Sequence, residues 1–351
     1  MNLSKSQKDI VEATEKKILV ASCAGSGKTT CLVSRLKYLL EHGYAAEEIV
    51  AITFTNAAAQ EIMERLNQPA ELFIGTIHSL ANTYLRGANV DTRDYIEKEE
   101  FDKLFELIKV NPDCVKKVKY LLLDEGQDST RQQFEFMFDI INPEEWMIFA
   151  DWRQSIFRWN GAYPDYILKL LHNPSVTTYN LNENYRNCLT ILEFAQAIIR
   201  TAGYPYEDFS KTKRTEKGEV AVVKYNAEAL YSGIQKRGDY KDWFILARTN
   251  DQIDMVCRDL EKFGIPYDSF KRTGMSNKEL NAKMAENSVK VLTIHTAKGL
   301  EAKNVVVIGA KSFNIEETCI SYVAATRAKN LLVWVLENRA SKKLITQNWE
   351  T

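Results

Sequence analysis

A lysine and two threonines end a glycine-rich turn, CAGSGKTT, at residues 23–30. The apolar run KILVAS precedes this turn, and a helical pattern follows it. Gly25 and Gly27 let the backbone turn tightly, so that amide N–H groups converge on a phosphate at the helix N-terminus. Lys28 would then reach the β- and γ-phosphates of a nucleotide, and the Thr29 hydroxyl would bind Mg²⁺. The spacing therefore predicts a nucleotide-binding loop.

Ser22 departs from the usual phosphate-loop pattern, G-x-x-x-x-G-K-[ST], which has a glycine at this position. A small residue still fits there, so the prediction of a nucleotide site stands. The alternative is a glycine-rich turn that precedes a lysine by chance, and the strand before it and the helix after it argue against that reading.

Four polar residues follow the apolar part of VKYLLLDEGQD, at residues 118–128. Acids can solvate the end of a buried strand, but a strand can also hold carboxylates rigidly at a reaction centre. Beside a phosphate loop the second reading is favoured. Asp124 would bind Mg²⁺ directly or through water, and Glu125 would orient and deprotonate an attacking water.

Short apolar runs, loops and amphipathic helical patterns alternate along the chain. The runs lie at 17–22, 48–54, 71–76, 118–124, 145–151 and 176–181, and again at 219–225, 242–248, 288–294, 304–310 and 331–336. Nearly continuous apolar runs indicate strands covered on both faces, and hence mostly parallel sheets in an α/β fold. We expect two lobes of similar size, residues 1–180 and 181–351, with a solvated connector at 211–219.

The composition is that of an ordinary globular protein: 351 residues, 45% hydrophobic and 26% charged, with a net charge of −1. Any contact with nucleic acid must therefore come from a local groove rather than from a basic body. The six cysteines form no CxxC pair, which argues against disulfides and zinc and for a reducing compartment. No apolar stretch approaches the roughly 20 residues of a membrane span. We expect a cytoplasmic protein that contacts no membrane.

The order of the motifs resembles the UvrD/Rep/PcrA branch of superfamily 1 DNA helicases, from Gln7 to about Trp334. The resembling blocks are LSKSQKDIV (3–11), ASCAGSGKTTCLVSRL (21–36), AITFTNAAAQEIMERL (51–66), IGTIHSL (74–80), LLLDEGQD (121–128), FADWRQSIFRWNGA (149–162), LNENYRN (181–187), VLTIHTAKGLEAKNVVVIG (291–309) and SYVAATRAKNLLVW (321–334). The resemblance implies two RecA-like P-loop NTPase lobes with mostly parallel sheets and ATP bound between them. It also implies movement along single-stranded DNA, 3′ to 5′.

The resemblance implies roles for individual residues at the nucleotide. Gln7 matches the adenine-reading glutamine, and Gln154 matches the glutamine that senses the γ-phosphate. Arg186 and Arg327 match two arginine fingers. The full catalytic set is Lys28, Asp124, Glu125, Gln154, Arg186 and Arg327; the nucleotide-binding set is Gln7, Ala24, Gly25, Ser26, Gly27, Lys28, Thr29, Thr30, Arg35, Tyr185, Gly299 and Glu301; the Mg²⁺ set is Thr29 and Asp124.

The two arginines lie in the second half of the chain, whereas Lys28, Asp124 and Glu125 lie in the first. A hydrolysis site completed by arginines from another lobe must lie in the cleft between the lobes. Such an arginine is worth about 10³–10⁵ in rate, so closure of the cleft would gate hydrolysis. Closing and opening of the cleft with each ATP would change the distance between two surfaces that bind the DNA strand, which would produce one step along it. For each arginine alone, a surface salt bridge is the alternative.

Three aromatic residues, Phe54, Phe157 and Trp159, could stack on bases at about 1–3 kcal/mol each. Contacts with phosphate or sugar are expected from Thr55, Asn56, Thr76, His78, Thr293 and His295. The alternative for any of them is a core aromatic or a helix cap, and Asn56 and Thr76 precede helical patterns directly.

The chain departs from this family where the family carries a helical accessory domain in each lobe. Only 33 residues, 85–117, fill the first place, and only 21, from Asp268 to Ser288, fill the second. We therefore expect a minimal form without accessory subdomains, in which strand separation needs a partner or several copies. Asn160 stands where the family usually has arginine, and Ala302 where it usually has phenylalanine. Both changes agree with a reduced nucleic-acid surface, and the first removes a charge from the strand groove, which predicts weaker binding of DNA.

The expected partners are single-stranded DNA, tailed duplex DNA and a protein that loads the motor or helps to separate strands. One rival hypothesis is an ATP-driven switch that recruits a partner protein, with nucleic acid as its signal rather than its track. A second is a small-molecule phosphotransferase, which does not explain a second lobe carrying arginines.

Overall fold

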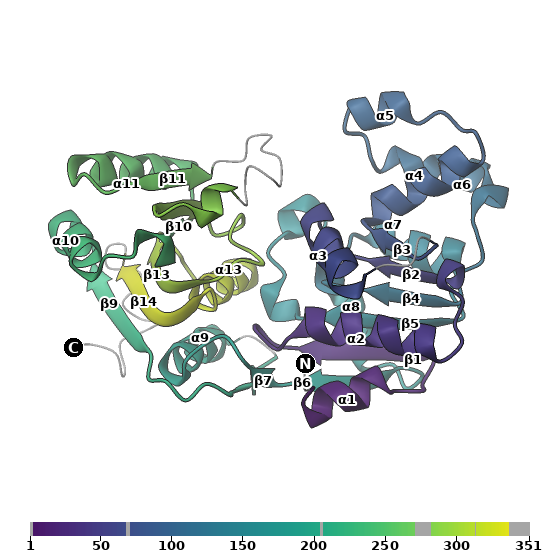
Figure 1. Ribbon diagram of the computed structural model, residues 1–351, viewed down its shortest axis with the longest axis horizontal. Coiled ribbons are helices and arrows are strands. Elements are labelled where there is room, and N and C mark those ends of the chain that lie inside the picture. Colours follow the sequence, from purple (N-terminus) through teal and green to yellow (C-terminus); the bar gives the residue numbers. More distant parts are fainter. Residues whose placement is uncertain (1–2, 68–70, 204–205, 271–281, 313, 337–351) are drawn as a thin grey trace. The chain divides into compact units, whose positions relative to one another are not determined.

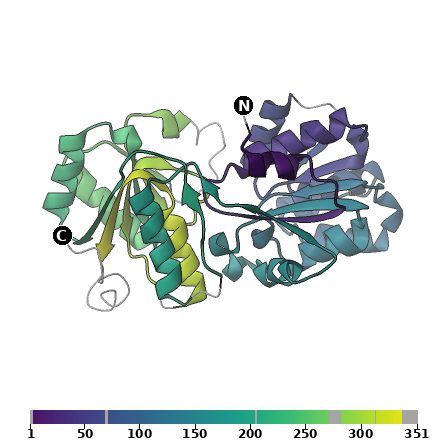
Figure 2. The same cartoon turned by 90° about the horizontal axis from the view of Figure 1, so that it is seen from below.

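We analysed a computed structural model that describes residues 3–67, 71–203, 206–270, 282–312 and 314–336. The chain forms two compact units (Figures 1 and 2). The first comprises Met1–Ser22 and Gly27–Leu181, and the second comprises Cys23–Ser26 and Asn182–Thr351. The first half of the phosphate loop thus groups with the second unit.

The first unit is built on a six-stranded sheet in which every paired strand is parallel. Its strands are β1 (Lys17–Ser22), β2 (Ile49–Ile52), β3 (Phe73–Gly75), β4 (Tyr120–Leu123), β5 (Glu145–Ala150) and β6 (Thr177–Leu181), in the order β3-β2-β4-β5-β1-β6. The central strands are almost wholly buried, which explains their uninterrupted apolar sequences. Figure 2 shows helices on both faces of this sheet.

The helices of the first unit are α1 (Lys5–Val11), α2 (Lys28–Glu41), α3 (Asn56–Leu66), α4 (Ile77–Gly87), α5 (Arg93–Glu97), α6 (Lys103–Val110), α7 (Arg131–Glu135) and α8 (Pro164–Leu171). Short helical turns join them: η1 (Ala46–Glu48), η2 (Pro112–Cys114), η3 (Gly126–Asp128), η4 (Phe136–Ile141, a π-helix), η5 (Trp152–Gln154) and η6 (Arg158–Asn160). Turns η3 and η5 follow β4 and β5 directly, so they lie at the carboxyl ends of adjacent strands.

The second unit has a six-stranded parallel sheet of its own. Its strands are β9 (Glu219–Lys224), β10 (Trp243–Ala247), β11 (Tyr267–Phe270), β12 (Val289–Thr293), β13 (Ala302–Ile308) and β14 (Ala328–Leu336), in the order β11-β12-β10-β13-β14-β9. Its helices are α9 (Leu189–Thr201), α10 (Ala227–Arg237), η7 (Tyr240–Asp242), α11 (Asn250–Lys262) and α13 (Ile315–Ala325). A small parallel pair, β7 (Glu183–Asn184) and β8 (Lys211–Thr212), completes the unit.

The predicted α/β class and the parallel sheets are confirmed. Each predicted apolar run overlaps a strand, and the run at 17–22 coincides with β1. The pattern missed β7, β8 and β11; β8 starts the segment 211–219, which we predicted to be a connector. Short strands that carry few apolar residues give no periodic signal.

Two segments, residues 85–117 and 268–288, stand where the resemblance implies that relatives carry accessory domains. Residues 85–117 hold the end of α4, then α5, α6 and η2. In the other, residues 271–281 lie outside the described part of the chain. The ends of that segment are joined by Lys290, which is fully buried and whose Nζ lies 2.8 Å from Asp268 Oδ2 and 2.6 Å from Ser288 Oγ.

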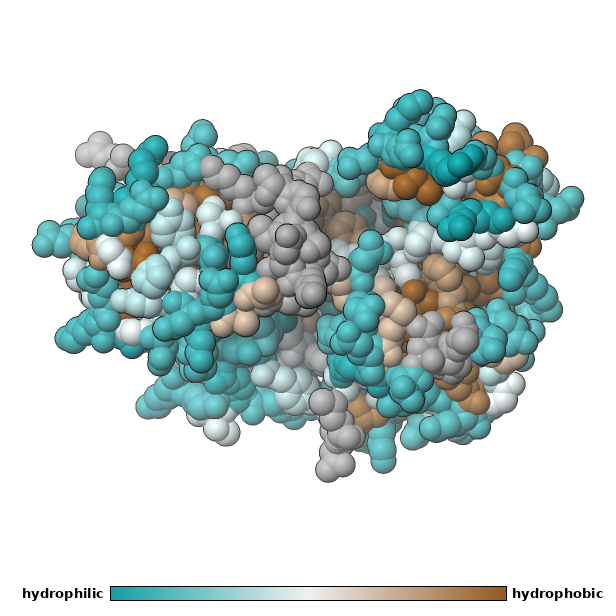
Figure 3. Space-filling view, turned by 45° about the horizontal axis from the view of Figure 1, so that its top comes forward, coloured by the Kyte–Doolittle hydropathy of each residue, from teal (hydrophilic) through white to brown (hydrophobic). Residues whose placement is uncertain are grey.

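Hydrophilic side chains cover most of the face drawn in Figure 3, with apolar patches between them. Among the residues that the structure describes, no helix is both long and apolar enough to cross a membrane.

Candidate functional site

Sheet order brings the predicted catalytic groups of the first unit together. Strands β1 and β4 both pair with β5, so the segments that follow these three strands leave the same edge of the sheet side by side. The phosphate loop follows β1, Asp124 and Glu125 follow β4, and Asp151 follows β5. Functional groups commonly collect at this edge of parallel sheets.

The phosphate loop has the backbone that its glycines predict. Gly27 has a φ of 78° and precedes the first residue of α2, Lys28. A Cβ on Gly27 would lie 2.9 Å from Gln7 Nε2, so glycine meets both a conformational and a steric need. Ser22 fits the position of the missing glycine, because it is 1% exposed and its Oγ donates to the Ala150 carbonyl at 2.9 Å.

Lys28 forms an ion pair with Glu125, with 3.0 Å between Nζ and Oε1. Burial by itself lowers the pKa of Lys28, but the carboxylates of Glu125, Asp124 and Asp151 outweigh burial and raise it. Lys28 therefore carries its charge at neutral pH. In this structure the lysine and the predicted general base neutralise each other.

Glu125 is held in an uncommon backbone conformation, with a φ of 52°. Asp124, just before it, is 7% exposed and accepts a hydrogen bond from the Glu125 N–H at 3.0 Å. Non-glycine residues with left-handed backbones are often found at functional sites, where the surrounding structure holds them in place. Gln127 supplies part of that hold by donating from Nε2 to Glu125 Oε2 at 2.5 Å.

Asp151 is the centre of a buried network behind the phosphate loop. Its carboxylate accepts from Gln154 Nε2 at 2.7 Å and from Arg153 Nε at 2.7 Å. Arg153 Nη2 also donates to the Ser22 carbonyl at 2.8 Å, at the end of β1. The network therefore fixes the predicted phosphate sensor, Gln154, to the strand that carries the phosphate loop.

Gln7 lies in α1 and Arg35 in α2, the helix that follows the phosphate loop. Gln7 completes a capping box with Ser4 at the start of α1. Arg35 is 2% exposed, and its Nη1 donates to the carbonyls of Val11 and Ala13, both at 2.7 Å. These hydrogen bonds give Arg35 the role of fastening the end of α1 to α2, and its place in the nucleotide-binding set stays a prediction.

In the second unit, the first half of the phosphate loop is held by the residues around Tyr185. Asn184 Nδ2 donates to the Ala24 carbonyl at 2.8 Å, and the Tyr185 N–H donates to the Gly25 carbonyl at 2.9 Å. A Cβ on Gly25 would lie 2.5 Å from the Cβ of Arg186, so only glycine fits. Arg186 is thus adjacent to the loop segment 23–26.

Arg186 and Glu301 also meet within the second unit. Arg186 Nε donates to Glu301 Oε2 at 2.5 Å, and Lys329 Nζ lies 2.6 Å from Glu301 Oε1. Burial opposes ionisation of this carboxyl, but Arg186 and Lys329 together lower the pKa of Glu301 to about 2. A residue of the predicted nucleotide-binding set, Glu301, therefore holds a residue predicted to be an arginine finger, Arg186.

Arg327 lies deeper than its predicted role suggests, at 1% exposure. Its guanidinium donates to the carbonyls of Val323 at 3.0 Å and Leu300 at 3.3 Å. Direct contact with a phosphate would require these bonds to be released.

A Mg²⁺ site of the predicted kind fits the donors that are present. Asp124 follows β4 directly and offers a hard oxygen ligand near Lys28, and Thr29 is the second residue of α2. Mg²⁺ keeps several waters and takes substrate phosphate oxygens, so it needs few protein ligands. Accordingly, the described residues contain no cluster of three or more His, Cys, Asp or Glu that would form an all-protein site.

The predicted DNA-contacting aromatics form one group in the first unit. Phe54 and Phe157 stack with ring centroids 5.1 Å apart, and Phe157 meets Trp159 edge-on at 6.4 Å. Trp159 is 57% exposed and Phe54 is 40% exposed. Large apolar rings left exposed side by side form a surface on which bases can stack.

Several residues predicted to contact DNA phosphate or sugar lie at helix starts or strand ends. Thr55 and Thr76 each cap a helix through the side-chain oxygen, with Ala58 N–H and Ser79 N–H as donors. Asn56 does not cap α3, because it is already the first helical residue. Thr293 is the last residue of β12 in the second unit, and His295 follows that strand. Thr293 Oγ1 accepts from the Thr296 N–H at 3.1 Å.

His78 packs against residues of the short segment 85–117. Its ring lies 5.5 Å from that of Phe101 and 5.3 Å from that of Phe105, and Nε2 is 3.4 Å from Asp102 Oδ1. Burial lowers the pKa of His78, and Asp102 opposes this only in part. Both rings and the Asp102 carboxylate thus lie against the imidazole, and the contact of His78 with DNA phosphate or sugar stays a prediction.

Sequence reasoning missed Gln127, Arg153, Asn184 and Lys329. Each lies inside a motif block, but its role depends on a partner far along the chain. The sequence offers one signal for Gln127, a glutamine that stands between acids in the stretch DEGQD.

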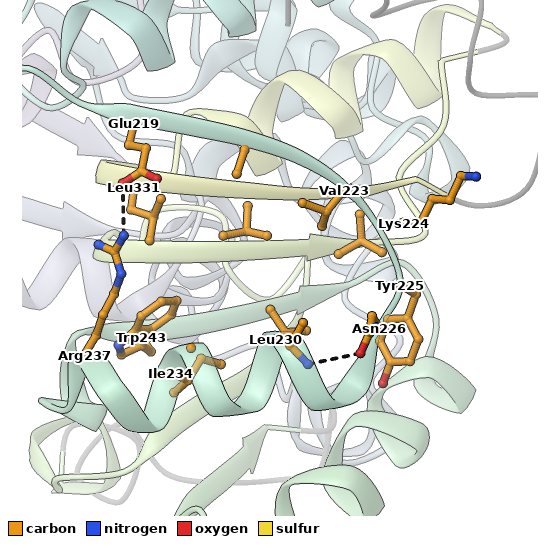
Figure 4. Close-up of a pocket in the computed structure, with 15 residues that line it drawn as sticks. Glu219, Val223, Lys224, Tyr225, Asn226, Leu230, Ile234, Arg237, Trp243 and Leu331 are labelled. Carbon is orange, nitrogen blue, oxygen red and sulfur yellow. Dashed lines mark hydrogen bonds and ion pairs between the residues drawn. The ribbon is translucent and has the colours of Figure 1, made fainter. Parts of the chain in front are cut away.

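An apolar cavity of about 220 Å³ lies elsewhere in the second unit, between α10 and strands β9 and β14 (Figure 4). Ala221, Val223, Leu331 and Val333 line the strand side. None of the predicted nucleotide or DNA residues lines it.

Two family models match the chain. The "UvrD/REP helicase N-terminal domain" matches residues 3–109 and 100–175, and the "UvrD-like helicase C-terminal domain" matches residues 268–339. The "ATP-dependent DNA helicase Rep" of Buchnera aphidicola subsp. Acyrthosiphon pisum is 25% identical over 371 residues, which cover 76% of this chain and 57% of that protein. Its namesake from Escherichia coli K12 is 24% identical over 369 residues, covering 76% and 55%. A "Probable DNA helicase" of Mycoplasma pneumoniae is 25% identical over 456 residues, covering 95% and 83%.

The chain spans little more than half the length of these Rep proteins. The aligned 371 positions exceed the whole chain of 351 residues, although only 76% of the chain takes part. The Buchnera protein therefore carries residues inside the aligned stretch that have no counterpart here.

Proposed function

The chain belongs to the UvrD/Rep family of helicases, and from that premise we propose that it is an ATP-driven motor. It hydrolyses ATP between its two RecA-like lobes and moves 3′ to 5′ along single-stranded DNA. The observation that carries the proposal is the meeting of Lys28 and Glu125 at 3.0 Å, at the edge where three strands of one sheet end.

Hydrolysis follows from the roles of these groups. Lys28 and the amides of the phosphate loop bind the triphosphate and offset its charge. Glu125 takes a proton from a water whose oxygen attacks the γ-phosphorus. The bond from that phosphorus to the β,γ-bridging oxygen breaks, and ADP leaves with the electron pair. Arg186 stabilises the charge on the transferring phosphoryl group, as an arginine finger does.

Thr29 and Asp124 would hold Mg²⁺, which supplies neutralisation of phosphate charge when bound. Gln154 senses the γ-phosphate, and Asp151 keeps its amide oriented. Only a few residues separate Gln154 from Phe157 and Trp159, so a change at the phosphate is passed along one short segment to the stacking surface.

The DNA surface combines Phe54, Phe157 and Trp159 with backbone contacts at the starts of α3 and α4. Stacking on exposed rings accepts any base, as a motor that moves along a strand requires. The accessory segments are short, and a relative carries extra residues in the aligned stretch. Both observations support a minimal motor, one that separates strands with the help of a loading protein or of further copies.

The test is ATP hydrolysis with single-stranded DNA, duplex DNA and RNA, together with translocation to a labelled strand end. We expect strong stimulation by single-stranded DNA that depends on its length, with arrival at the 5′ end. Hydrolysis stimulated without directed movement would favour the alternative, a DNA-stimulated switch that recruits a partner protein. Unwinding of a 3′-tailed duplex by the chain alone would contradict the need for a partner.

A further inference from the structure

Gln127 lies between the predicted general base and the network of Asp151, and it is fully buried. Its Nε2 donates to Glu125 Oε2 at 2.5 Å and to Asp128 Oδ2 at 3.4 Å. Its Oε1 accepts from the Asp151 N–H at 3.0 Å. The side chain therefore joins groups that follow two adjacent strands, β4 and β5.

The orientation of this amide is fixed by chemistry. A backbone N–H can only donate, so the oxygen of the amide must face Asp151. Both amide hydrogens then point toward the carboxylates of Glu125 and Asp128, which can only accept when ionised. A hydrogen bond to a charged acceptor is stronger than one between neutral groups.

The two oxygens of the Glu125 carboxylate have different partners. Lys28 lies at Oε1, and Gln127 lies at Oε2. When a nucleotide binds, Lys28 gives up its contact with Glu125, because the lysine of a phosphate loop reaches the β- and γ-phosphates. Gln127 has no such second task and stays on Oε2. When the contact with Lys28 is lost, the hydrogen bond from Gln127 still fixes the orientation of the Glu125 carboxylate.

We propose that Gln127 is a positioning residue that aims the carboxylate of Glu125 at the attacking water and anchors it to the segment after β5. This inference rests on the proposed hydrolysis of ATP. It adds a residue that acts through Glu125 and touches neither the nucleotide nor the water.

The experiment measures steady-state ATP hydrolysis of the full chain and the variants Gln127→Met, Glu125→Gln and the double variant. Displacement of a reacting group by about 1 Å costs about 10²-fold in rate. We therefore expect kcat of Gln127→Met to fall about 10²-fold, with KM for ATP within about twofold of wild type. In the Glu125→Gln background, the second substitution should cost nothing further. Gln60→Met is the matched control, since Gln60 donates to Glu64 at 2.9 Å on the exposed face of α3.

Each outcome decides one question. No hydrolysis by the wild-type chain would overturn the proposed function, and this inference with it. Hydrolysis that is lost in Glu125→Gln but unchanged in Gln127→Met would overturn only this inference. So would an equal loss from Gln127→Met in both backgrounds, because Gln127 would then act independently of Glu125.

If Gln127→Met does not fold, the pH dependence of ATP hydrolysis by Gln127→Glu tests the same role. The introduced carboxylate can still accept from Asp151, but when ionised it cannot donate to Glu125. Neighbouring carboxylates raise its pKa, and its protonated form can donate. We expect the rate relative to wild type to recover as the pH falls from 8 toward 5.5. A ratio that is flat across this range would overturn the positioning role.

Discussion

Arg186 and Glu301 are joined by a hydrogen-bonded ion pair of 2.5 Å between Nε and Oε2, although 115 residues separate them. The second oxygen of Glu301 faces Lys329 at 2.6 Å. The side chains of Arg186 and Glu301 are 14% and 37% exposed, so the pair is only partly open to water. Arg186 is therefore held in a defined position in the second unit, beside Gly25 of the phosphate loop.

Glu301 should make the stability of the protein depend on pH in the acid range. Arg186 and Lys329 hold the pKa of Glu301 at about 2 against its ordinary 4.5, although burial opposes them. The ionised carboxylate therefore stabilises the fold above pH 4.5, and this contribution is lost as the pH falls through about 2. Melting curves of wild type and Glu301→Gln should differ at neutral pH and converge over that window. Glu228→Gln, at the exposed start of α10, is the control, and a pH-independent gap for Glu301→Gln would contradict the linkage.

Arg186→Ala should lower kcat for ATP hydrolysis by about 10³–10⁵, the effect of losing an arginine finger. Arg186→Lys should restore little of this loss, because an ammonium group does not bind phosphate in the bidentate manner of a guanidinium. Arg237→Ala, which removes an exposed arginine paired with Glu219, should leave the rate unchanged. A rate for Arg186→Ala within about tenfold of wild type would be incompatible with the finger role.

Trp159→Ala should weaken binding of single-stranded DNA. Loss of one stacked base costs about 1–3 kcal/mol, which corresponds to roughly 5- to 150-fold in Kd. Fluorescence anisotropy with a labelled oligonucleotide measures this directly. Phe209→Ala removes a ring that is 72% exposed in the second unit and outside every motif block, so it is the matched control. Equal losses for the two variants would remove the specific role of Trp159.

Asn160→Arg should strengthen the same interaction. The added guanidinium neutralises one further phosphate, so the salt dependence for a single strand should steepen by about 0.7 in log–log slope. Asn160 follows Trp159 directly in η6, next to the stacking group. Unchanged affinity and slope would show that residue 160 does not face the strand.

Arg35→Met should destabilise the first unit rather than alter nucleotide specificity. It leaves the carbonyls of Val11 and Ala13 without their buried donor, at a cost of about 1–3 kcal/mol for each unsatisfied group. Urea denaturation should show the loss. Lys37→Met, on the exposed side of α2, should change the unfolding free energy by about 0.5 kcal/mol or less. If Arg35→Met unfolds at the wild-type urea concentration, the fastening role is wrong.

The sequence by itself determined the apolar strands of both sheets, the phosphate loop and the pair of acids that follows β4. Apolar runs fully buried in parallel sheets carry their own signal, so the strand at 17–22 was found at its true bounds. The spacing of Gly25, Gly27 and Lys28 encodes the backbone of the turn, whereas the hydrogen bonds from Asn184 and Tyr185 that hold its first half come from far along the chain. Asp124 and Glu125 follow their strand directly, so sheet order alone brings them to the phosphate loop.

Tertiary structure decided what each buried polar side chain touches. The sequence could not show that Arg35 and Arg327 are buried against backbone carbonyls, or that Phe101 and Phe105 cover His78. It could not show that Gln127 joins Glu125 to Asp151. Local spacing sets backbone geometry, whereas a hydrogen bond between distant residues exists only after the strands that carry them have paired.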